Sequence, residues 1–296
     1  MLASSQNKEI QGKKVLAAKD SIRPSVVPAE IKIDSRLNEI TSAHIPSGEG
    51  SYSVVVKNLQ TGEEYLLNEN KKYDSASLYK LWVMAVVYQE IKDGKLKEDD
   101  LLSAEVGKLN DALSTVTPTP TPEGFSAPTV TGEPEKISMT VGEALEKMIT
   151  ISDNYAAILL SSKVGSKKIA NFIKDSGFTS SNYKQPPQTT AHDMSLFFEM
   201  LYKGKIIDNE YSEKMIDLLK KQTLNDRIPK YLEDEVQVAH KTGELFGSKH
   251  DAGIVYSRNV DYIIVVLSET KDYKKAAENI AKYSEEIYEY FDSKSN

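Results

Sequence analysis

The hydrophobic pattern alternates with a period of two near both ends of the chain. Apolar and polar residues alternate from Ser51 to Leu59, and a second run covers Glu64 to Leu67 after a turn at residues 60–63. Two such runs joined by a short turn that contains glycine are typical of a β-hairpin. Later runs with strand character cover residues 236–240, 252–257 and 262–268. The pattern therefore predicts strands early and late in the chain.

Between these strands the apolar positions recur with a helical period. A short amphipathic helix is also expected between Ile31 and Ile45, and a final one from Lys274 to Phe291. Early and late strands around a helical block predict an α+β fold, with an antiparallel sheet flanked by terminal helices beside an all-α lobe. Within the block, helices are expected from residue 77, over 140–150, from 154, and over 166–176, 190–203 and 212–221.

Two stretches differ in composition from the rest. Residues 1–30 are polar and keep no regular period, which predicts a flexible leader or a wall-spanning tether. Residues 115–134 are rich in proline and threonine, and proline both removes backbone donors and holds the preceding residue extended, so we expect a surface insertion there. Residues 31–296 are expected to form one domain, with an α/β lobe (31–75 and 225–296) and an all-α lobe (76–224).

Composition narrows the classes of function. The net charge of −7 argues against a nucleic acid partner. The chain has no cysteine, so disulfides and thiolate-bound metals are excluded. The four histidines, His44, His192, His240 and His250, show no H-x-x-x-H spacing, which argues against a metal enzyme. No metal and no other cofactor is expected.

The sequence as given shows no membrane or export signal. It has no run of about 18 apolar residues, so no transmembrane segment is expected. Residues 1–5 lack the apolar region of a signal peptide. These observations leave two possibilities open, a cytosolic protein or an exported one whose signal was removed.

Ser77-Leu78-Tyr79-Lys80 carries the strongest candidate chemistry. A serine hydroxyl is a weak nucleophile until a nearby base takes its proton. Residues three apart on a helix share one face, so Lys80 Nζ is expected close to Ser77 Oγ. The apolar residues that follow predict a buried helix, and burial lowers the pKa of a lysine toward the range of a general base. Taken alone the spacing is weak evidence, because most such pairs lie on solvated helix faces.

Two further motifs follow in order, Ser152-Asp153-Asn154 after a helical run and Lys241-Thr242-Gly243 on a strand. The three motifs together resemble those of the penicillin-binding proteins and class A β-lactamases. The flanking residues of the second and third motifs agree with this resemblance, which runs from about residue 35 to the C-terminus. It implies a β-lactamase/transpeptidase-like fold, with the first motif at the junction of the two lobes.

The resemblance assigns the reacting groups. It implies that Ser77 is the nucleophile, Lys80 its base or proton relay, and Ser152 a proton shuttle to the leaving nitrogen. The oxyanion hole of the family uses two backbone N–H groups, which are carried over to Ser77 and Glu244. Asp153 is expected to brace its loop by hydrogen bonds rather than to touch substrate.

The same resemblance assigns the substrate contacts. Asn154 is expected to donate to the side-chain amide of the substrate and to contact Lys80. Lys241 and Thr242 would hold the substrate carboxylate, and Gly243 would leave room for the substrate along the strand edge. His250 falls where many relatives place an arginine or a small hydroxyl residue, so it is a candidate anion contact below its pKa of roughly 6.5. The alternative for His250 is a surface loop residue, and His240 is expected to point away from the substrate.

The chain departs from the class A pattern in one loop. Class A enzymes carry a glutamate in an Ω-loop that activates the water for deacylation. Here Thr189-Thr190 resembles the segment after that loop. The preceding segment, residues 179–188, is short and contains no carboxylate. Because loss of a general base costs about two to four orders of magnitude in rate, we expect slow deacylation or another route. The 115–134 insertion has a functional alternative, a flap over the cleft.

A second departure is Glu244, where the family usually has a small residue. Its carboxylate could repel a substrate carboxylate, pair with a nearby lysine or replace the missing base, and pairing with a lysine is the preferred interpretation.

Three functions remain open from the sequence. The first is a β-lactamase-type serine hydrolase that forms an acyl-serine and turns over slowly. The second is a penicillin-binding D,D-peptidase that acts on cell-wall peptides. The third is a non-catalytic β-lactam sensor or wall-binding module. The resemblance implies a small-molecule substrate and an extracytoplasmic location. A monomer is expected, although the sequence does not determine the oligomeric state.

Overall fold

The computed structural model describes residues 35–45, 50–116 and 135–293. The expected leader at residues 1–30, and all of the expected insertion except residues 115 and 116, lie outside these ranges. In the part of the chain that is described, no helix is long and apolar enough to cross a membrane.

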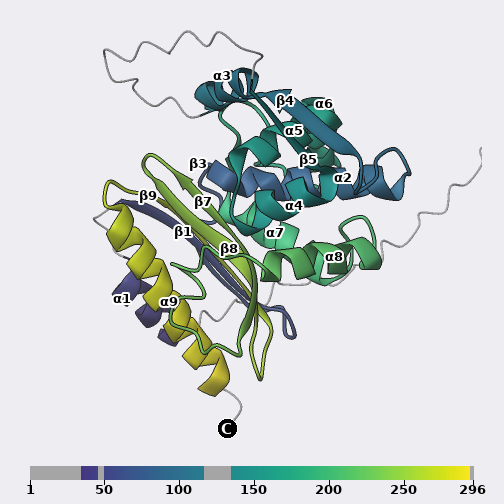
Figure 1. Cartoon of the computed structure of the whole chain (residues 1–296). Coiled ribbons are helices and arrows are strands. Elements are labelled where there is room, and N and C mark those ends of the chain that lie inside the picture. The colour runs from purple at the N-terminus through teal and green to yellow at the C-terminus, as the bar shows by residue number, and fades with distance from the viewer. Residues whose placement is uncertain (1–34, 46–49, 117–134, 294–296) are drawn as a thin grey trace, which may run out of the picture. The chain divides into compact units, whose positions relative to one another are not determined.

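A five-stranded antiparallel sheet forms the centre of the fold (Figure 1). The predicted hairpin is present, with Val55 of one strand opposite Leu66 of the other. The strand order is β2-β1-β9-β8-β7, so β7 is an edge strand. The strands are β1 (Ser51–Asn58), β2 (Glu64–Leu67), β7 (Gln237–Leu245), β8 (Ser248–Tyr256) and β9 (Tyr262–Glu269).

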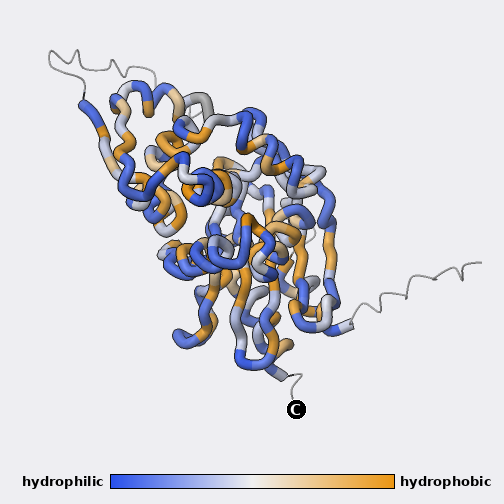
Figure 2. Tube along the Cα trace, turned by 90° about the vertical axis from the view of Figure 1, so that its right-hand side faces the viewer, coloured by the Kyte–Doolittle hydropathy of each residue, from blue (hydrophilic) through white to orange (hydrophobic). Residues whose placement is uncertain are grey.

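Both faces of the sheet are buried, which explains the strongly apolar late strands. On one face Val54 and Ile264 pack against α1 (Ser35–His44) and α9 (Tyr273–Ser293). On the other face neighbouring strand residues such as Val55 pack against the helical lobe. Hydrophobic segments concentrate in the interior and hydrophilic ones on the outside (Figure 2). The predicted α+β architecture, with terminal helices on one face of the sheet, is confirmed.

The helical lobe lies on the opposite side of the sheet from α9 (Figure 1). It also contains a two-stranded antiparallel sheet, β4 (Leu101–Glu105) with β5 (Lys136–Thr140), which the sequence pattern did not indicate. A second small pairing joins β3 (Tyr73–Asp74) to β6 (Gln188–Thr189). The helices are α2 (Lys80–Lys92), α3 (Val106–Val116), α4 (Val141–Thr150), α5 (Asn154–Val164), α6 (Ser166–Asp175), α7 (Ala191–Tyr202) and α8 (Asn209–Lys220).

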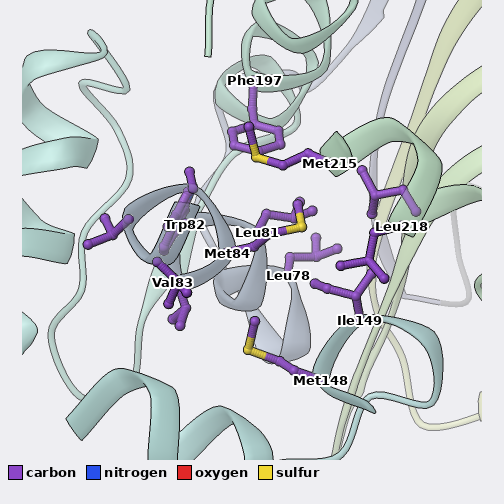
Figure 3. Close-up of a cluster of buried hydrophobic side chains, with 14 of the residues drawn as sticks. Leu78, Leu81, Trp82, Val83, Met84, Met148, Ile149, Phe197, Met215 and Leu218 are labelled. Atoms are coloured by element: carbon purple, nitrogen blue, oxygen red, sulfur yellow. The ribbon is translucent and has the colours of Figure 1, made fainter. Parts of the chain in front are cut away.

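Helix α2 runs through the middle of this lobe and is surrounded by apolar side chains, as its sequence predicts. Leu81, Trp82 and Val83 are fully buried. Figure 3 shows side chains from α4, α7 and α8 packed around this helix, among them Met148 and Phe197. Burial on all sides fixes the position of α2 and therefore of the Ser-x-x-Lys motif at its start.

Candidate active site

Ser77 lies on a single 3₁₀ turn, Ala76–Tyr79, that leads directly into α2. In a 3₁₀ turn residues i and i+3 are eclipsed, which places Ser77 and Lys80 on the same side. The preceding residue, Ala76, has a positive φ of 46°, an uncommon conformation for a residue other than glycine. The turn is also fixed by a hydrogen bond of 2.7 Å from Ser75 N to Pro187 O. Ser77 is half-buried at this junction.

The ammonium group of Lys80 is fully buried and its contacts are with the second motif. Nζ donates to Ser152 O at 2.7 Å, to Ser152 Oγ at 3.1 Å and to Asn154 Oδ1 at 2.8 Å. Burial lowers the pKa of Lys80 to about 7, although the nearby charge of Asp153 acts in the opposite direction. An amine with this pKa exists partly in its neutral form near pH 7 and can then accept a proton.

Ser152 Oγ joins the second motif to the third. Lys241 Nζ donates to Ser152 Oγ at 3.0 Å and to Thr242 O at 3.0 Å. Lys241 is fully buried, and burial followed by the charge of Lys80 lowers its pKa well below the usual range. Ser152 itself has a positive φ of 57°, so the backbone is held in an uncommon conformation to place this hydroxyl.

The rest of the second motif begins helix α5. Asp153 is the N-cap residue, and its side chain accepts a hydrogen bond of 2.7 Å from Ala156 N. This is the bracing contact that the sequence predicted for Asp153. Asn154 follows as the first helical residue and is exposed, with its amide oxygen on Lys80.

Ser77 opens into a small cleft of about 60 Å³ between the two lobes. Both residues predicted to supply the oxyanion-hole N–H groups, Ser77 and Glu244, line it. Pockets for drug-sized ligands usually measure about 300–1,000 Å³, so a β-lactam fits only if the walls separate or part of it stays outside. The lining residues are Ala76, Ser77, Tyr79, Leu113, Asn154, Ile158, Pro186, Pro187, Glu244 and Leu245.

The third motif is on the edge strand β7 and faces the nucleophile turn. Thr242 and Gly243 are buried beside Lys241. A Cβ placed on Gly243 would lie 3.2 Å from His250 Cβ and 3.2 Å from Leu78 Cγ. A side chain at position 243 would therefore be in tight contact with both neighbours, so the close approach of strand and turn favours glycine there.

The carboxylate of Glu244 is paired with two cations. Lys249 Nζ contacts Glu244 Oε2, which is the lysine pairing preferred from the sequence. Arg227 Nη2 also donates to Glu244 Oε2, at 2.7 Å. The glutamate side chain itself remains 56% exposed.

Arg227 is the site residue that the sequence did not indicate. Its side chain is only 3% exposed, and Nη1 has no hydrogen-bond partner among the described residues. Nε lies 3.5 Å from Asp226 Oδ1, without the geometry of a hydrogen bond. A single arginine between two predicted elements belongs to no recognisable sequence motif. Its burial behind the third motif is therefore visible only in the tertiary structure.

The structure corrects the interpretation of His250. It is neither a surface loop residue nor placed to bind an anion, because it lies fully buried in strand β8. Nδ1 accepts a hydrogen bond from Ser268 N at 3.0 Å, and Nε2 is 2.9 Å from Asp74 O, to which it donates. Burial lowers the pKa of His250 to about 4, so the ring is neutral near pH 7. His250 links the sheet to the strand that precedes Ser77.

His240 lies in β7 next to Lys241 and is almost fully buried. Its Nδ1 is 2.9 Å from Asp251 Oδ1 and its Nε2 is 3.1 Å from Asn225 Oδ1. Like Lys241 and Thr242, it does not line the cleft of Ser77, so the direction of its side chain relative to a substrate stays a prediction.

The segment between α6 and α7 closes another side of the cleft. Pro186 and Pro187 line the cleft, and Gln185 lines an adjoining cavity of about 160 Å³ with Tyr79. Residues 176–190 contain no aspartate or glutamate. Of the residues that line the cleft, Glu244 is the one that carries a carboxylate.

Ser77 lies on a 3₁₀ turn, and a buried lysine of low pKa, Lys80, follows it by three residues. Lys80 and a second buried lysine, Lys241, both donate to Ser152 Oγ. This arrangement resembles the one expected for a serine acyl-transfer site of the penicillin-recognising type. The model of the beta-lactamase enzyme family matches residues 32–291, so the chain belongs to that family. No curated protein matches the sequence.

Solved structures share this fold. The β-lactamase of Sphaerobacter thermophilus superposes with a TM-score of 0.74 at 21% identity, covering 88% of this chain and 99% of that one. PBP-A superposes with a TM-score of 0.74 at 18% identity, and the match covers 88% of this chain and 97% of PBP-A. The extended-spectrum β-lactamase TLA-1 has a TM-score of 0.72 at 19% identity, and the match covers 86% of this chain and 98% of TLA-1. At these identities the likeness establishes the fold.

Proposed function

We propose that this protein is a serine hydrolase that opens the amide of a β-lactam through an acyl-enzyme on Ser77 and releases the product slowly. The observation that carries the proposal is the hydrogen-bond network Lys80–Ser152–Lys241. Lys80 follows Ser77 by three residues, and Asn154, which accepts from Lys80 Nζ, lines the cleft together with Ser77.

In this mechanism neutral Lys80 takes the proton of Ser77 Oγ, directly or through Ser152, as Oγ attacks the carbonyl carbon. The tetrahedral oxyanion forms against the N–H groups of Ser77 and Glu244. When the C–N bond breaks, Ser152 delivers the proton to the leaving nitrogen and is reprotonated from a lysine. Lys241 and Thr242 hold the carboxylate of the substrate, and Asn154 its side-chain amide.

Slow deacylation follows from the environment of the acyl group. Segment 176–190 supplies no carboxylate to activate a water, and the Glu244 carboxylate is already paired with Arg227 and Lys249. Without a positioned base the hydrolytic step loses about two to four orders of magnitude.

A D,D-peptidase acting on cell-wall peptides is the second candidate, favoured by the same lack of a base. It is also consistent with the likeness to PBP-A, a variant of which is described as an acyl-enzyme complex with penicillin G. Either activity would place the protein outside the cytoplasm, where such substrates lie, and neither requires a cofactor or a partner chain.

The test is to mix the purified protein with a chromogenic cephalosporin and to record product and intact mass together. A stoichiometric burst with a persistent adduct on Ser77, followed by slow steady turnover, is the expected result. Cleavage of D-alanyl peptides in parallel would favour the peptidase. A lasting adduct with no turnover of either substrate would indicate a sensor. No adduct at high drug concentration, or full activity in Ser77→Ala, would overturn the proposal.

A further inference from the structure

A second cavity, called the side cavity below, adjoins the cleft of Ser77. It has a volume of about 160 Å³ and lies between the nucleophile turn, α3, α5 and the segment that precedes α7. Tyr79, Ile158 and Pro187 line both the cleft and the side cavity, so the two spaces share a wall. The lining residues of the side cavity are Tyr79, Ala112, Ile158, Ser161, Ser162, Tyr183, Gln185 and Pro187.

One face of α5 leads from the cleft to the side cavity. Asn154, Ile158 and Ser162 follow one another at intervals of four residues, so they lie on the same face of the helix. Asn154 lines the cleft, Ser162 lines the side cavity and Ile158 lines both. One helical turn advances about 5.4 Å, so a substrate group one turn beyond Asn154 meets the side cavity at Ile158.

The side cavity is uncharged. None of its lining residues has an ionic side chain apart from the two tyrosines, which ionise only at high pH. Burial raises the pKa of Tyr79 further, and it also raises the pKa of Tyr183 although a hydrogen bond with Ser161 acts in the opposite direction. Both phenols are therefore neutral near pH 7. A charged guest would lose its hydration here without gaining an opposite charge, so the side cavity favours an uncharged group.

Two of its walls are aromatic. The rings of Tyr79 and Tyr183 have centroids 5.9 Å apart and planes at 59° to each other. Aromatic pairs are favourable at centroid distances of about 4.5–7 Å, so a guest ring can pack against both tyrosines in the same way. The lining residues that are exposed, Ser162 and Gln185, are polar. Apolar walls with a few polar groups are typical of small-molecule sites.

The volume of the side cavity suits one six-membered ring. Apolar protein cavities of about 150 Å³ bind benzene. The cleft of Ser77, at about 60 Å³, is much smaller and also has to admit the reacting amide. A ring on the acyl donor therefore has room in the side cavity but not in the cleft.

We propose that the side cavity is the subsite for an uncharged aryl group on the side chain of the acyl donor, and that Tyr79 and Tyr183 make the protein selective for donors that carry one. This inference rests on the proposed acylation of Ser77. The side-chain amide of the donor stays at Asn154, and the group beyond the amide passes Ile158 to reach the two tyrosines. Selectivity between donors then depends on residues that do not touch the reacting atoms.

The experiment compares two penicillins that differ only in this group. Benzylpenicillin carries a phenyl ring on the methylene of its side chain, and the analogue with an acetyl side chain carries hydrogen there. The second-order rate constant for adduct formation on Ser77 is measured for each compound by intact mass. The readout is the ratio of the two constants, benzylpenicillin over the acetyl analogue, which cancels general effects of a substitution on the reactivity of Ser77.

In wild type the ratio is expected to be about 10 to 100, the factor that burial of one aromatic group supplies. Tyr183→Leu keeps an apolar side chain but removes one aromatic wall, and should lower the ratio about two- to tenfold. Ala112 lines the side cavity and not the cleft, so Ala112→Phe fills the subsite and should lower the ratio toward one.

Tyr211→Leu is the matched control for Tyr183→Leu. The rings of Tyr211 and Tyr88 are also 5.9 Å apart, with planes at 58°, but Tyr211 lines neither the cleft nor the side cavity. Its ratio should equal that of wild type.

A lower ratio in Tyr183→Leu or in Ala112→Phe, with the wild-type ratio in Tyr211→Leu, supports the inference. A wild-type ratio near one, as expected if the side cavity holds only water, overturns it and leaves acylation of Ser77 intact. The wild-type ratio in both cavity variants, or an equal fall in Tyr211→Leu, also overturns it. Absence of an adduct with both compounds overturns the proposed function and, with it, the inference.

Discussion

Lys80 and Lys241 donate hydrogen bonds to the same atom, Ser152 Oγ, over 3.1 and 3.0 Å. Both lysines are fully buried, and they come from opposite lobes, one from α2 and the other from β7. Two ammonium groups on one hydroxyl repel each other at low dielectric, which favours the loss of a proton from the pair. The arrangement holds an amine of lowered pKa three residues after Ser77, at the start of α2.

The first prediction concerns the pH dependence of acylation. Burial lowers the pKa of Lys80 from 10.5 to about 7, so the amine is protonated below that pH and neutral above it. The acylation rate constant should therefore rise about tenfold per pH unit below 7 and level off above it. Stopped-flow or mass measurements with one β-lactam between pH 5 and 9 give the profile. A flat profile would contradict the assignment of Lys80 as the base.

The control for this prediction is Lys80→Arg, which retains the positive charge but does not release its proton in this range. We expect its acylation rate to fall by about two to four orders of magnitude at every pH. Circular dichroism shows whether the variant keeps its fold.

The second prediction is for Ser152→Ala, which removes the shared acceptor of the two lysines and the expected proton shuttle. Acylation should slow by at least about a hundredfold, because proton transfer to the leaving nitrogen is lost. Ser138 donates to Ser103 Oγ at an exposed position, so Ser138→Ala is a matched control that should react as wild type does. Equal rates for the two variants would remove Ser152 from the mechanism.

The third prediction compares two glycines. In Gly243→Ala the new methyl group meets His250 and Leu78 at 3.2 Å, and both belong to buried, fixed elements. We expect a loss of about 1–3 kcal/mol in the free energy of unfolding. Gly107 lies in helix α3, and a Cβ added there would meet nothing within 4 Å, so Gly107→Ala should add about 0.4–1 kcal/mol to the free energy of unfolding. Urea unfolding of both variants measures these changes. If the free energy of unfolding changes in the same direction in both variants, the packing argument is refuted.

Local sequence patterns were sufficient to predict much of the fold. The alternation from Ser51 to Leu59 and the glycine turn after it predict the β1–β2 hairpin, and the structure places those strands within one residue of the expected ends. The apolar residues after Lys80 predict the burial of α2. The three motifs identify the residues that the fold brings together at Ser152 Oγ, since spacing and residue type are local properties.

Contacts between distant segments could not be predicted in this way. The sequence predicts His250 either as an anion contact or as a surface loop residue, yet its ring is buried and hydrogen-bonded to Ser268 N and Asp74 O. Arg227 was missed because its partner Glu244 is on another element. Polar residues buried in a tertiary network give no periodic signal, and this network is the part of the site that only the structure reveals.

The fourth prediction concerns the stability of the folded protein at low pH. His250 stays neutral in the folded protein down to about pH 4, whereas in the unfolded chain it takes up a proton below about 6.5. The unfolded state therefore binds more protons between pH 6.5 and 4, so stability falls as the pH decreases through this range and the loss ends below about 4. This one side chain should account for about 3 kcal/mol of acid destabilisation.

His250→Gln keeps an amide that can donate to Asp74 O but does not titrate. It should be less stable than wild type at pH 7, because the amide fills the site of the ring incompletely. The difference should shrink as the pH falls from 6.5 to 4, and urea unfolding at several pH values measures it. His192 is 54% exposed, and His192→Gln serves as the exposed control in the same measurements. A constant difference between His250→Gln and wild type over this range would show that His250 is not held neutral by the fold.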